Sequence, residues 1–308
     1  MNNQPKPSIG FVGLGNMGGP MCKRLLDAGY PVTAFDLNPS ALDVAVASGA
    51  KPAVSAAACA GGSDIFLTSL PRPDHVQAVM CGDGGALKAL HSGAVWVDLT
   101  TNRKELVLQM AIDAPAGVRV VDSPVTGAVD GARNGNLTLF IGGDDATVAR
   151  VLPVLGHLGK VIHCGPLGTG NVVKLVTNQL WFIAAAAIGE GFATGIANGV
   201  ELGVLWDAIK NSVGDSFVVR HDAPSIFAGH YDPSFSLDLC LKDLGLIAEL
   251  GKQVKAELPM THAAQHAFAV AAQRYGPQAA ELHVAKRIED DAQLSMRLDG
   301  NWTPPWEQ

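Results

Sequence analysis

The residues best suited to acid–base chemistry are a lysine and an asparagine one helical turn apart, Lys174 and Asn178. Side chains four residues apart lie on one face of a helix, so the two point the same way. An apolar setting disfavours the charged ammonium and suits a lysine to proton transfer, while Asn178 would hold a substrate hydroxyl beside it. A lysine that extends to solvent and an asparagine that packs the helix explain the pair at least as well. The remaining residues of that turn are apolar: Val172, Val173, Leu175 and Val176.

A second candidate for substrate binding is the turn Thr126-Gly127-Ala128, which follows an expected strand over residues 118–122. A glycine after a hydroxyl residue leaves backbone N–H groups exposed. Together with the Thr126 hydroxyl, such groups can hold a carboxylate.

A cofactor site is indicated near the N-terminus, where a short apolar run leads into Gly13-Leu14-Gly15-Asn16-Met17-Gly18. The glycines fit the G-x-G-x-x-G pattern of a strand, turn and helix. The first allows the tight turn, the second lets a pyrophosphate approach the backbone, and the third permits close packing of helix on strand. Plain connections and flavin or methyl-donor enzymes also contain such turns, so the pattern alone does not define the cofactor.

Asp36 ends the next expected strand, over residues 30–36. A carboxylate about 20 residues after the glycines can accept hydrogen bonds from the adenosine ribose and repel a 2′-phosphate. Its neighbours are Leu37 and Asn38 rather than arginine, which favours NAD over NADP. The alternative is an aspartate that caps a helix or stabilises a turn.

Further strands are expected to alternate with helices, which is typical of a parallel sheet wrapped by helices. Such sheets bind ligands at the C-terminal ends of their strands, where Leu70, Pro71 and Thr101 stand. Thr101 is a candidate donor to the nicotinamide end, although Thr100 or Thr101 is also expected to cap the helix that begins near Lys104. The expected strands cover residues 64–70, 94–99, 118–122, 136–143 and 161–164, and the first helices 20–28 and 74–81.

The pattern changes at Gly168, where a long apolar helix over residues 172–197 opens a region without strand signals. The predicted fold class is α/β, with an N-terminal Rossmann-type doubly wound sheet joined by this helix to an all-α domain. The longest apolar run, 180–188, is too short to span a membrane, so we expect the helix to be buried between domains or subunits. The expected divisions are a tail (1–7), the dinucleotide-binding domain (8–166), a helical substrate and oligomerisation domain (167–300) and a second tail (301–308).

The composition narrows the class of protein further. The 308 residues carry a net charge of -7 with no long basic run, which argues against nucleic acid or an anionic membrane as a partner. Five scattered cysteines and the absence of an apolar signal core favour a cytoplasmic enzyme with reduced thiols. His262 and His266 have the spacing of metal ligands but no recognisable third ligand, so no metal is expected.

Four segments together resemble, in order and spacing, the motifs of the β-hydroxyacid dehydrogenases, the family of 3-hydroxyisobutyrate dehydrogenase and tartronate semialdehyde reductase. The resemblance runs from about residue 9 to about residue 287. The segments are Gly13-Leu14-Gly15-Asn16-Met17-Gly18, Asp122-Ser123-Pro124-Val125-Thr126-Gly127, Gly168-Thr169-Gly170-Asn171-Val172-Val173-Lys174-Leu175 and Lys242-Asp243-Leu244.

The resemblance implies a role for each matching residue. Lys174 matches the catalytic lysine, Asn178 the substrate-orienting asparagine, and Thr126 and Gly127 the turn that holds the substrate carboxylate. Lys242 matches a lysine that contacts the cofactor when the domains close. Leu70, Pro71 and Thr101 match cofactor-side positions, Asp215 and Phe235 lie in the region that faces the distal end of the substrate, and the family usually forms dimers or tetramers.

Three departures from the family pattern bear on the substrate. The family usually has Ala where this chain has Ser123, Ser where it has Thr126, and a second Gly where it has Ala128. The added methyl groups of Thr126 and Ala128 are expected to make the substrate pocket narrower here. Asp215 would pair with an amino or hydroxyl group, unless it caps a helix, whereas Phe235 favours an apolar group.

The reaction expected from these residues is the reversible, NAD-dependent oxidation of a small β-hydroxy acid, with Lys174 as general acid and base. The alternatives are a reductase that works mainly toward the hydroxy acid, of the tartronate semialdehyde, succinic semialdehyde or glyoxylate type, and an imine reductase. A non-catalytic NAD-binding module fits less well with Lys174, Asn178 and the Thr126 turn present together.

Overall fold

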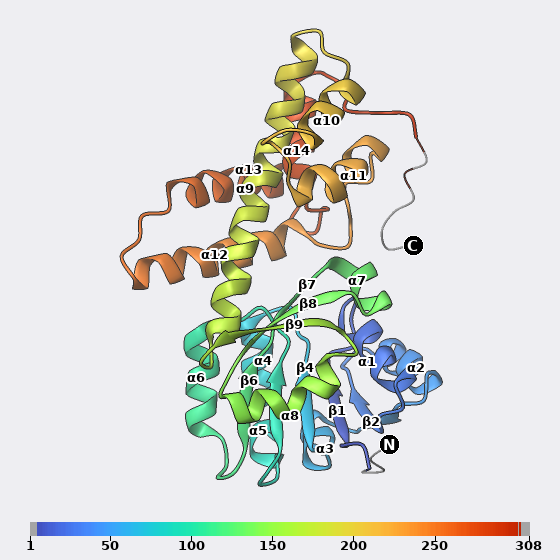
Figure 1. The fold of residues 1–308 in the computed structure, drawn as a ribbon, viewed down its shortest axis with the longest axis vertical. Coiled ribbons are helices and arrows are strands. Elements are labelled where there is room, and N and C mark those ends of the chain that lie inside the picture. The colour runs from blue at the N-terminus through green and yellow to red at the C-terminus, as the bar shows by residue number, and fades with distance from the viewer. Residues whose placement is uncertain (1–4, 301, 303–308) are drawn as a thin grey trace. The chain divides into compact units, whose positions relative to one another are not determined.

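The computed structural model describes residues 5–300 and 302, and it divides into two compact units between Lys174 and Leu175 (Figure 1). The predicted tails fall largely outside the described residues. Trp302, which lies in the second of these segments, packs its ring against Trp206 and Phe227 at centroid distances of 5.6 and 5.7 Å.

The first unit is built on one sheet, which comprises nine strands among the described residues. Strands β1 to β6 pair in parallel in the order β3-β2-β1-β4-β5-β6, and β8 then runs antiparallel to β6 and β7 and parallel to β9. The strands are β1 (Ile9–Val12), β2 (Val32–Phe35), β3 (Lys51–Pro52), β4 (Ile65–Thr68), β5 (Val95–Asp98), β6 (Arg119–Asp122), β7 (Val125–Thr126), β8 (Leu137–Gly142) and β9 (Gly159–Gly165).

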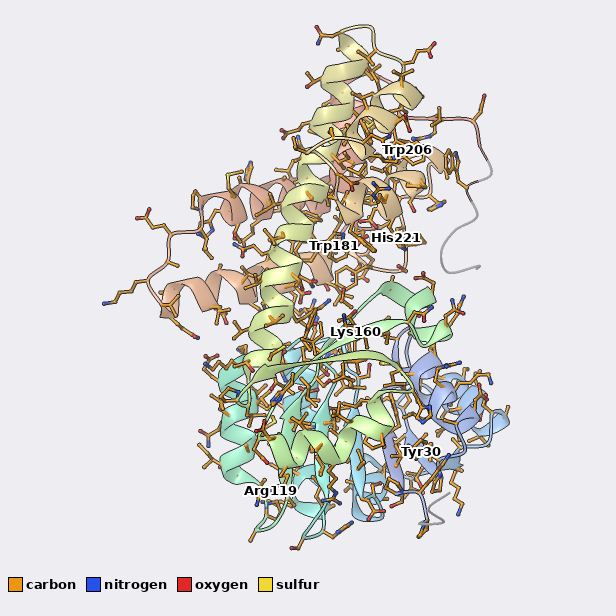
Figure 2. The ribbon with its side chains drawn as sticks, in the orientation of Figure 1. Tyr30, Arg119, Lys160, Trp181, Trp206 and His221 are labelled. Atoms are coloured by element: carbon orange, nitrogen blue, oxygen red, sulfur yellow. The ribbon has the colours of Figure 1, made fainter. Side chains whose placement is uncertain are left out.

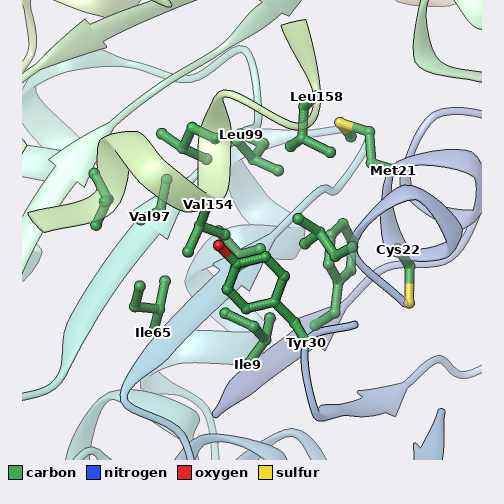
Figure 3. Packing of buried hydrophobic residues seen from close by; sticks show 14 of the residues in the cluster. Ile9, Met21, Cys22, Tyr30, Ile65, Val97, Leu99, Val154 and Leu158 are labelled. Atoms are coloured by element: carbon green, nitrogen blue, oxygen red, sulfur yellow. The ribbon is translucent and has the colours of Figure 1, made fainter. Parts of the chain in front are cut away.

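Side-chain alternation along the strands builds a separate core on each face of this sheet. Phe11 and Val97 point into one core, while Val12 and Trp96 point into the other. Figure 3 shows the first core around Tyr30, whose hydroxyl donates to the backbone oxygen of Pro153. That core is covered by α1 (Gly18–Asp27), α2 (Pro39–Ala47), α7 (Ala128–Asn134) and α8 (Asp145–Leu155), and the second by α3 (Ala56–Gly61), α4 (Pro73–Cys81), α5 (Ala86–Ala89) and α6 (Lys104–Asp113).

The predicted α/β class with a Rossmann-type sheet is confirmed. The antiparallel part of the sheet was not expected from the sequence, and neither was α7, which starts immediately after the Thr126-Gly127 turn. Thr126 itself ends the two-residue strand β7 and pairs with Thr138 of β8.

The elements of the second unit are helical throughout its described residues. The helix α9 (Thr169–Ala197) begins in the first unit and runs on through the second. By length and composition alone this helix could cross a membrane, a property it shares with core helices of soluble proteins, and 28% of its most apolar window is buried. The other helices are α10 (Leu202–Lys210), a π-helical turn (Val218–Asp222), α11 (Ala223–Ala228), α12 (Leu237–Gln253), α13 (Pro259–Tyr275) and α14 (His283–Ala292).

Candidate active site

The glycine turn connects β1 to α1, and each glycine in it has a different surrounding. Gly13 adopts a positive φ of 92°, and a β-carbon there would lie 2.2 Å from the backbone oxygen of Ser69. A β-carbon at Gly18 would lie 1.8 Å from the oxygen of Gly13, so this glycine is required for the helix to approach the strand. At Gly15, by contrast, a β-carbon would meet no atom of the described residues within 4 Å. The backbone at Gly15 therefore borders open space.

The start of α1 provides the positive end of a helix dipole at this turn. Met17 occupies the N-cap position and its side chain caps no amide, while the N–H of Gly19 donates to the backbone oxygen of Gly15 at 2.9 Å and Pro20 has no N–H. The helix dipole favours a phosphate at this end of α1. The turn thus fits the pyrophosphate of a dinucleotide, with Gly15 where a ligand comes close and Gly13 and Gly18 where the protein packs.

Asp36 lies at the same turn. One oxygen of its carboxylate accepts a hydrogen bond from the backbone N–H of Leu14 at 2.6 Å, and the other from that of Asn38 at 2.7 Å. These two bonds hold the carboxylate at the end of β2 beside the glycines. This is the position from which an acidic residue reaches the adenosine ribose in a Rossmann fold.

The ends of β4 and β5 are joined by a buried polar network. The carboxylate of Asp98 accepts hydrogen bonds from the Thr68 hydroxyl at 2.9 Å and from the Asn102 side-chain amide at 2.8 Å, and burial raises its pKa. The Thr100 hydroxyl accepts from the backbone N–H of Leu70 at 3.0 Å. Thr100 therefore fixes the loop after β4 rather than capping a helix.

The expectation that Thr100 or Thr101 caps α6 is wrong, because Arg103 holds the N-cap position, and it is the Asn102 side chain that accepts from the Arg103 N–H, at 2.8 Å. Leu70 lies beside the glycine turn, since its side chain is the neighbour that a β-carbon at Gly13 would meet at 3.0 Å. Leu70 and Pro71 follow β4, and Thr101 follows β5, so the predicted cofactor-side positions share the C-terminal edge of the sheet.

The start of α9 is capped by a carboxylate from far away in the chain. Asp122, the last residue of β6, accepts hydrogen bonds from the backbone N–H groups of Gly168 and Asn171, both at 2.6 Å. Burial raises the pKa of Asp122 to about 6. Because this pKa lies above the ordinary value of 3.8, the contribution of Asp122 to stability falls as the pH rises from about 4 to about 6.

Lys174 and Asn178 lie in the first turns of α9, as predicted. Both are buried, with 8% and 3% of their surface exposed. The Asn178 side-chain amide donates to Asp243 of α12 at 2.8 Å, and Lys242 forms an ion pair with the other oxygen of Asp243 at 2.8 Å. Since a carboxylate can only accept, it is the Asn178 Nδ2 that faces Asp243, and Oδ1 is the atom that can accept from a substrate hydroxyl. The roles of both residues in catalysis stay predictions.

Asp243 is a functional candidate for which sequence reasoning assigned no role. It orients Asn178 and pairs with Lys242, yet the two partners of its carboxylate are 65 residues and one residue away in the chain. The only signal was its place in the Lys242-Asp243-Leu244 motif.

The turn Thr126-Gly127-Ala128 contains a strained residue. Gly127 has a φ of 120° and precedes α7, and Ala128 follows with a φ of 56°. The left-handed region costs a residue with a β-carbon about 1–2 kcal/mol. Strain of this kind is found most often at functional sites.

Replacing Ala128 by glycine is expected to stabilise the protein. The relief of the left-handed strain exceeds the roughly 0.5–1 kcal/mol that a helical glycine costs, so the free energy of unfolding should rise by about 0.5 kcal/mol. Thermal denaturation of the variant beside Ala132→Gly, a change in the same helix at a buried position, measures this. A lower melting temperature for Ala128→Gly than for the wild type would contradict the strain.

Asp215 and Phe235 lie in different surroundings in the second unit. Asp215 accepts a hydrogen bond from the Arg220 guanidinium at 2.9 Å, and it is Ser216 whose hydroxyl caps the following turn. The ring of Phe235 lies 5.7 Å from that of Trp181, which stands three residues after Asn178 on α9.

Trp181 also donates to a buried aspartate that the sequence did not single out. The Asp222 carboxylate accepts from the Trp181 indole at 2.8 Å and contacts the His221 ring at 2.8 Å, and burial raises the pKa of Asp222 (Trp181 and His221 are labelled in Figure 2). The ring of His221 stacks on Phe217 at 4.5 Å.

A metal site is not apparent in the described part of the chain. No group of three or more His, Cys, Asp or Glu side chains among the described residues is arranged to hold an ion.

Two family models together match most of the chain. Residues 8–166 match the NAD-binding domain of 6-phosphogluconate dehydrogenase, and residues 168–288 match the NAD-binding domain of NADP-dependent 3-hydroxyisobutyrate dehydrogenase.

Individual proteins agree with these models. The 2-(hydroxymethyl)glutarate dehydrogenase of Eubacterium barkeri is 38% identical over 263 residues, which cover 84% of this chain and 87% of the relative. A 3-hydroxyisobutyrate dehydrogenase of Pseudomonas aeruginosa is 36% identical over 276 residues, which cover 86% and 92% of the two chains. The structure of Mycobacterium tuberculosis 3-hydroxyisobutyrate dehydrogenase with L-serine superposes with a TM-score of 0.84 at 29% identity, over 92% of this chain and 99% of that one.

The glycine turn, the acidic residue at the end of β2, the Rossmann-type sheet and the long helix with its buried lysine agree with these matches over nearly the whole chain. The protein is an oxidoreductase with an NAD(P)-binding domain and belongs to the β-hydroxyacid dehydrogenase family.

Proposed function

We propose that the protein catalyses the reversible, NAD-dependent oxidation of a small β-hydroxy acid to its semialdehyde or keto acid. The observation that carries the proposal is the buried Lys174, which shares a helix face with Asn178 at the start of α9. A lysine that is shielded from water suits general acid–base catalysis of alcohol oxidation.

Each residue has one task in the proposed reaction. The Thr126 hydroxyl and the N–H groups of the Gly127 turn bind the substrate carboxylate. Asn178 accepts a hydrogen bond from the β-hydroxyl, and Lys174 in its neutral form takes the hydroxyl proton as the carbonyl forms. The bound nicotinamide supplies the acceptor for the hydride that leaves the β-carbon. In the reductive direction, Lys174 returns the proton to the new hydroxyl.

The names of the relatives support a substrate class. Hydroxymethylglutarate, hydroxyisobutyrate and L-serine each have a primary alcohol on the carbon next to the one that bears a carboxylate. We therefore favour a primary β-alcohol and a semialdehyde product. The proposal includes a cytoplasmic location, which the scattered cysteines favour, and a homodimer or homotetramer, which the family resemblance implies.

Absorbance of NADH during incubation with candidate substrates tests the proposal. The panel comprises 3-hydroxyisobutyrate, L-serine, glycerate, threonate and 3-hydroxypropionate, with lactate as a control that lacks the β-hydroxyl. Oxidation of at least one β-hydroxy acid, with lactate inert, is expected. A protein that oxidises none of the panel but reduces cyclic imines would be an imine reductase instead.

The position of Asp36 predicts a preference for NAD over NADP. The 2′-phosphate of NADP would meet the Asp36 carboxylate, and a like-charge contact of this kind costs several kcal/mol, so kcat/KM should favour NAD by about 100-fold or more. Asp36→Asn should reduce that ratio by at least about tenfold, while Asp27→Asn, at an exposed aspartate paired with Lys23, should leave it unchanged. A wild-type preference for NADP would refute the role of Asp36.

A further inference from the structure

The side chain of Asn171 joins three segments of the first unit at one buried point. Its Oδ1 accepts from the backbone N–H of Asn102 at 2.7 Å, and its Nδ2 donates to Asp122 at 3.1 Å. Asn171, Asn102 and Asp122 are each fully buried. One amide therefore ties the loop after β5 and the end of β6 to the first turn of α9.

Each tied segment leads directly to a residue of the proposed reaction. Asn102 follows Thr101 on the nicotinamide side, Asp122 precedes Thr126 by four residues, and Lys174 stands one turn after Asn171 on α9. A displacement of about 1 Å between reacting groups can lower a rate by about 100-fold.

We propose that Asn171 is a positioning residue, which fixes Lys174 relative to the cofactor-side loop and the turn that binds the substrate carboxylate. This inference rests on the proposed role of Lys174.

The surroundings of this contact leave little room for adjustment. A β-carbon at Gly142 would lie 2.4 Å from one oxygen of Asp122, and a β-carbon at Gly170 would lie 2.9 Å from the other. Asp122 already caps α9 through backbone N–H groups, so the helix start does not need the Asn171 side chain for its cap. What the side chain adds is the connection to Asn102.

Asn171→Ala removes both side-chain hydrogen bonds and keeps the backbone cap. The expected result is a kcat lower by roughly 30- to 100-fold, with the KM for the hydroxy acid and the Kd for NADH changed by less than about threefold. The matched control is Asp144→Ala, which removes the aspartate that caps α8 through two bonds to Thr147 in the same unit. The control should lose a similar amount of thermal stability while retaining its kcat.

Asn171→Asp is nearly isosteric and supplies a second readout. The new carboxyl group would face Asp122, and two carboxyl groups at this distance share one proton when the pH is low enough. The shared proton restores the lost donor, so the kcat of this variant relative to the wild type should rise as the pH falls from about 8 to about 5. Asp98 and Cys164 are further titratable groups close to Asp122, and Lys174 stands one turn after residue 171 on α9. The pH dependence of kcat for the wild type is therefore measured beside that of the variant.

The outcomes separate the inference from the proposed function. A kcat within about threefold of wild type for Asn171→Ala would overturn the positioning role, and so would a fall in kcat matched by Asp144→Ala. If Asn171→Ala does not fold, the test is the kcat of Asn171→Asp relative to that of the wild type. A ratio of the two kcat values that does not depend on pH would overturn the positioning role. A wild-type protein that oxidises no hydroxy acid would instead refute the proposed function.

Discussion

Replacing Lys174 by alanine should lower kcat by about 10²- to 10⁴-fold, the range that a positioned general acid or base contributes. The variant should still bind NADH with a Kd within about threefold of the wild-type value, because the glycine turn and Asp36 are untouched. Steady-state kinetics with the best hydroxy acid and a fluorescence titration with NADH measure the two effects.

Two further variants sharpen this test. Lys174→Arg keeps the positive charge but cannot give up its proton near neutral pH, so it should be about as inactive as the alanine variant. Lys160→Ala removes an exposed lysine of β9 in the same unit and should be fully active (Lys160 is labelled in Figure 2). A kcat for Lys174→Ala within tenfold of the wild type, roughly 1.4 kcal/mol, would exclude Lys174 as the acid–base residue.

Two glycines of the same turn should differ in their response to alanine. Alanine at Gly15 should weaken NADH binding without loss of stability, whereas alanine at Gly18 should destabilise the fold. At Gly15 the added methyl group meets no atom of the described protein within 4 Å, so stability should be unchanged while the pyrophosphate is crowded. Overpacking of this size costs about 1–3 kcal/mol, which corresponds to an NADH affinity lower by about 10- to 100-fold. Thermal denaturation and NADH titration of the same preparation measure both.

Gly18→Ala is the matched variant. Its β-carbon would lie 1.8 Å from the backbone oxygen of Gly13, so the helix must move from the strand and the fold should lose about 3 kcal/mol or more. If Gly15→Ala lowers the melting temperature as much as Gly18→Ala and leaves the affinity for NADH unchanged, the turn does not bind the cofactor.

Local pattern was sufficient to predict the first strands of the parallel sheet and the glycine turn between them. The apolar run before Gly13 predicted β1, whose four residues are all buried, as is typical of a central parallel strand. The strand that precedes Asp36 predicted β2, in which buried and half-buried residues alternate. The helix expected over residues 172–197 begins three residues earlier, at Thr169, because Asp122 caps the first turn from a distance in the chain.

What the sequence could not reveal are contacts made across large separations. In the sequence, Asp122 is the last residue of a strand and Asn171 is a polar residue near a helix start. The backbone N–H of Asn171 nevertheless donates to the Asp122 carboxylate at 2.6 Å, although 49 positions separate the two residues. The contact of Asp243 could not be predicted either, because its hydrogen bond to Asn178 depends on how α9 and α12 pack. Thr100 or Thr101 was expected to cap a helix by the local rule, but the hydroxyl of Thr100 accepts from the backbone N–H of Leu70 in the loop after β4.

The hydrogen on the β-carbon of the substrate provides the decisive measurement. The best hydroxy acid of the panel, deuterated at its β-carbon, is incubated with NAD and the wild-type protein, and the reduced cofactor is analysed by mass spectrometry. We predict one deuterium in the NADH and an aldehyde product that a hydrazine traps. Unlabelled NADH would show that hydrogen leaves another carbon, and would contradict oxidation of a β-hydroxyl group.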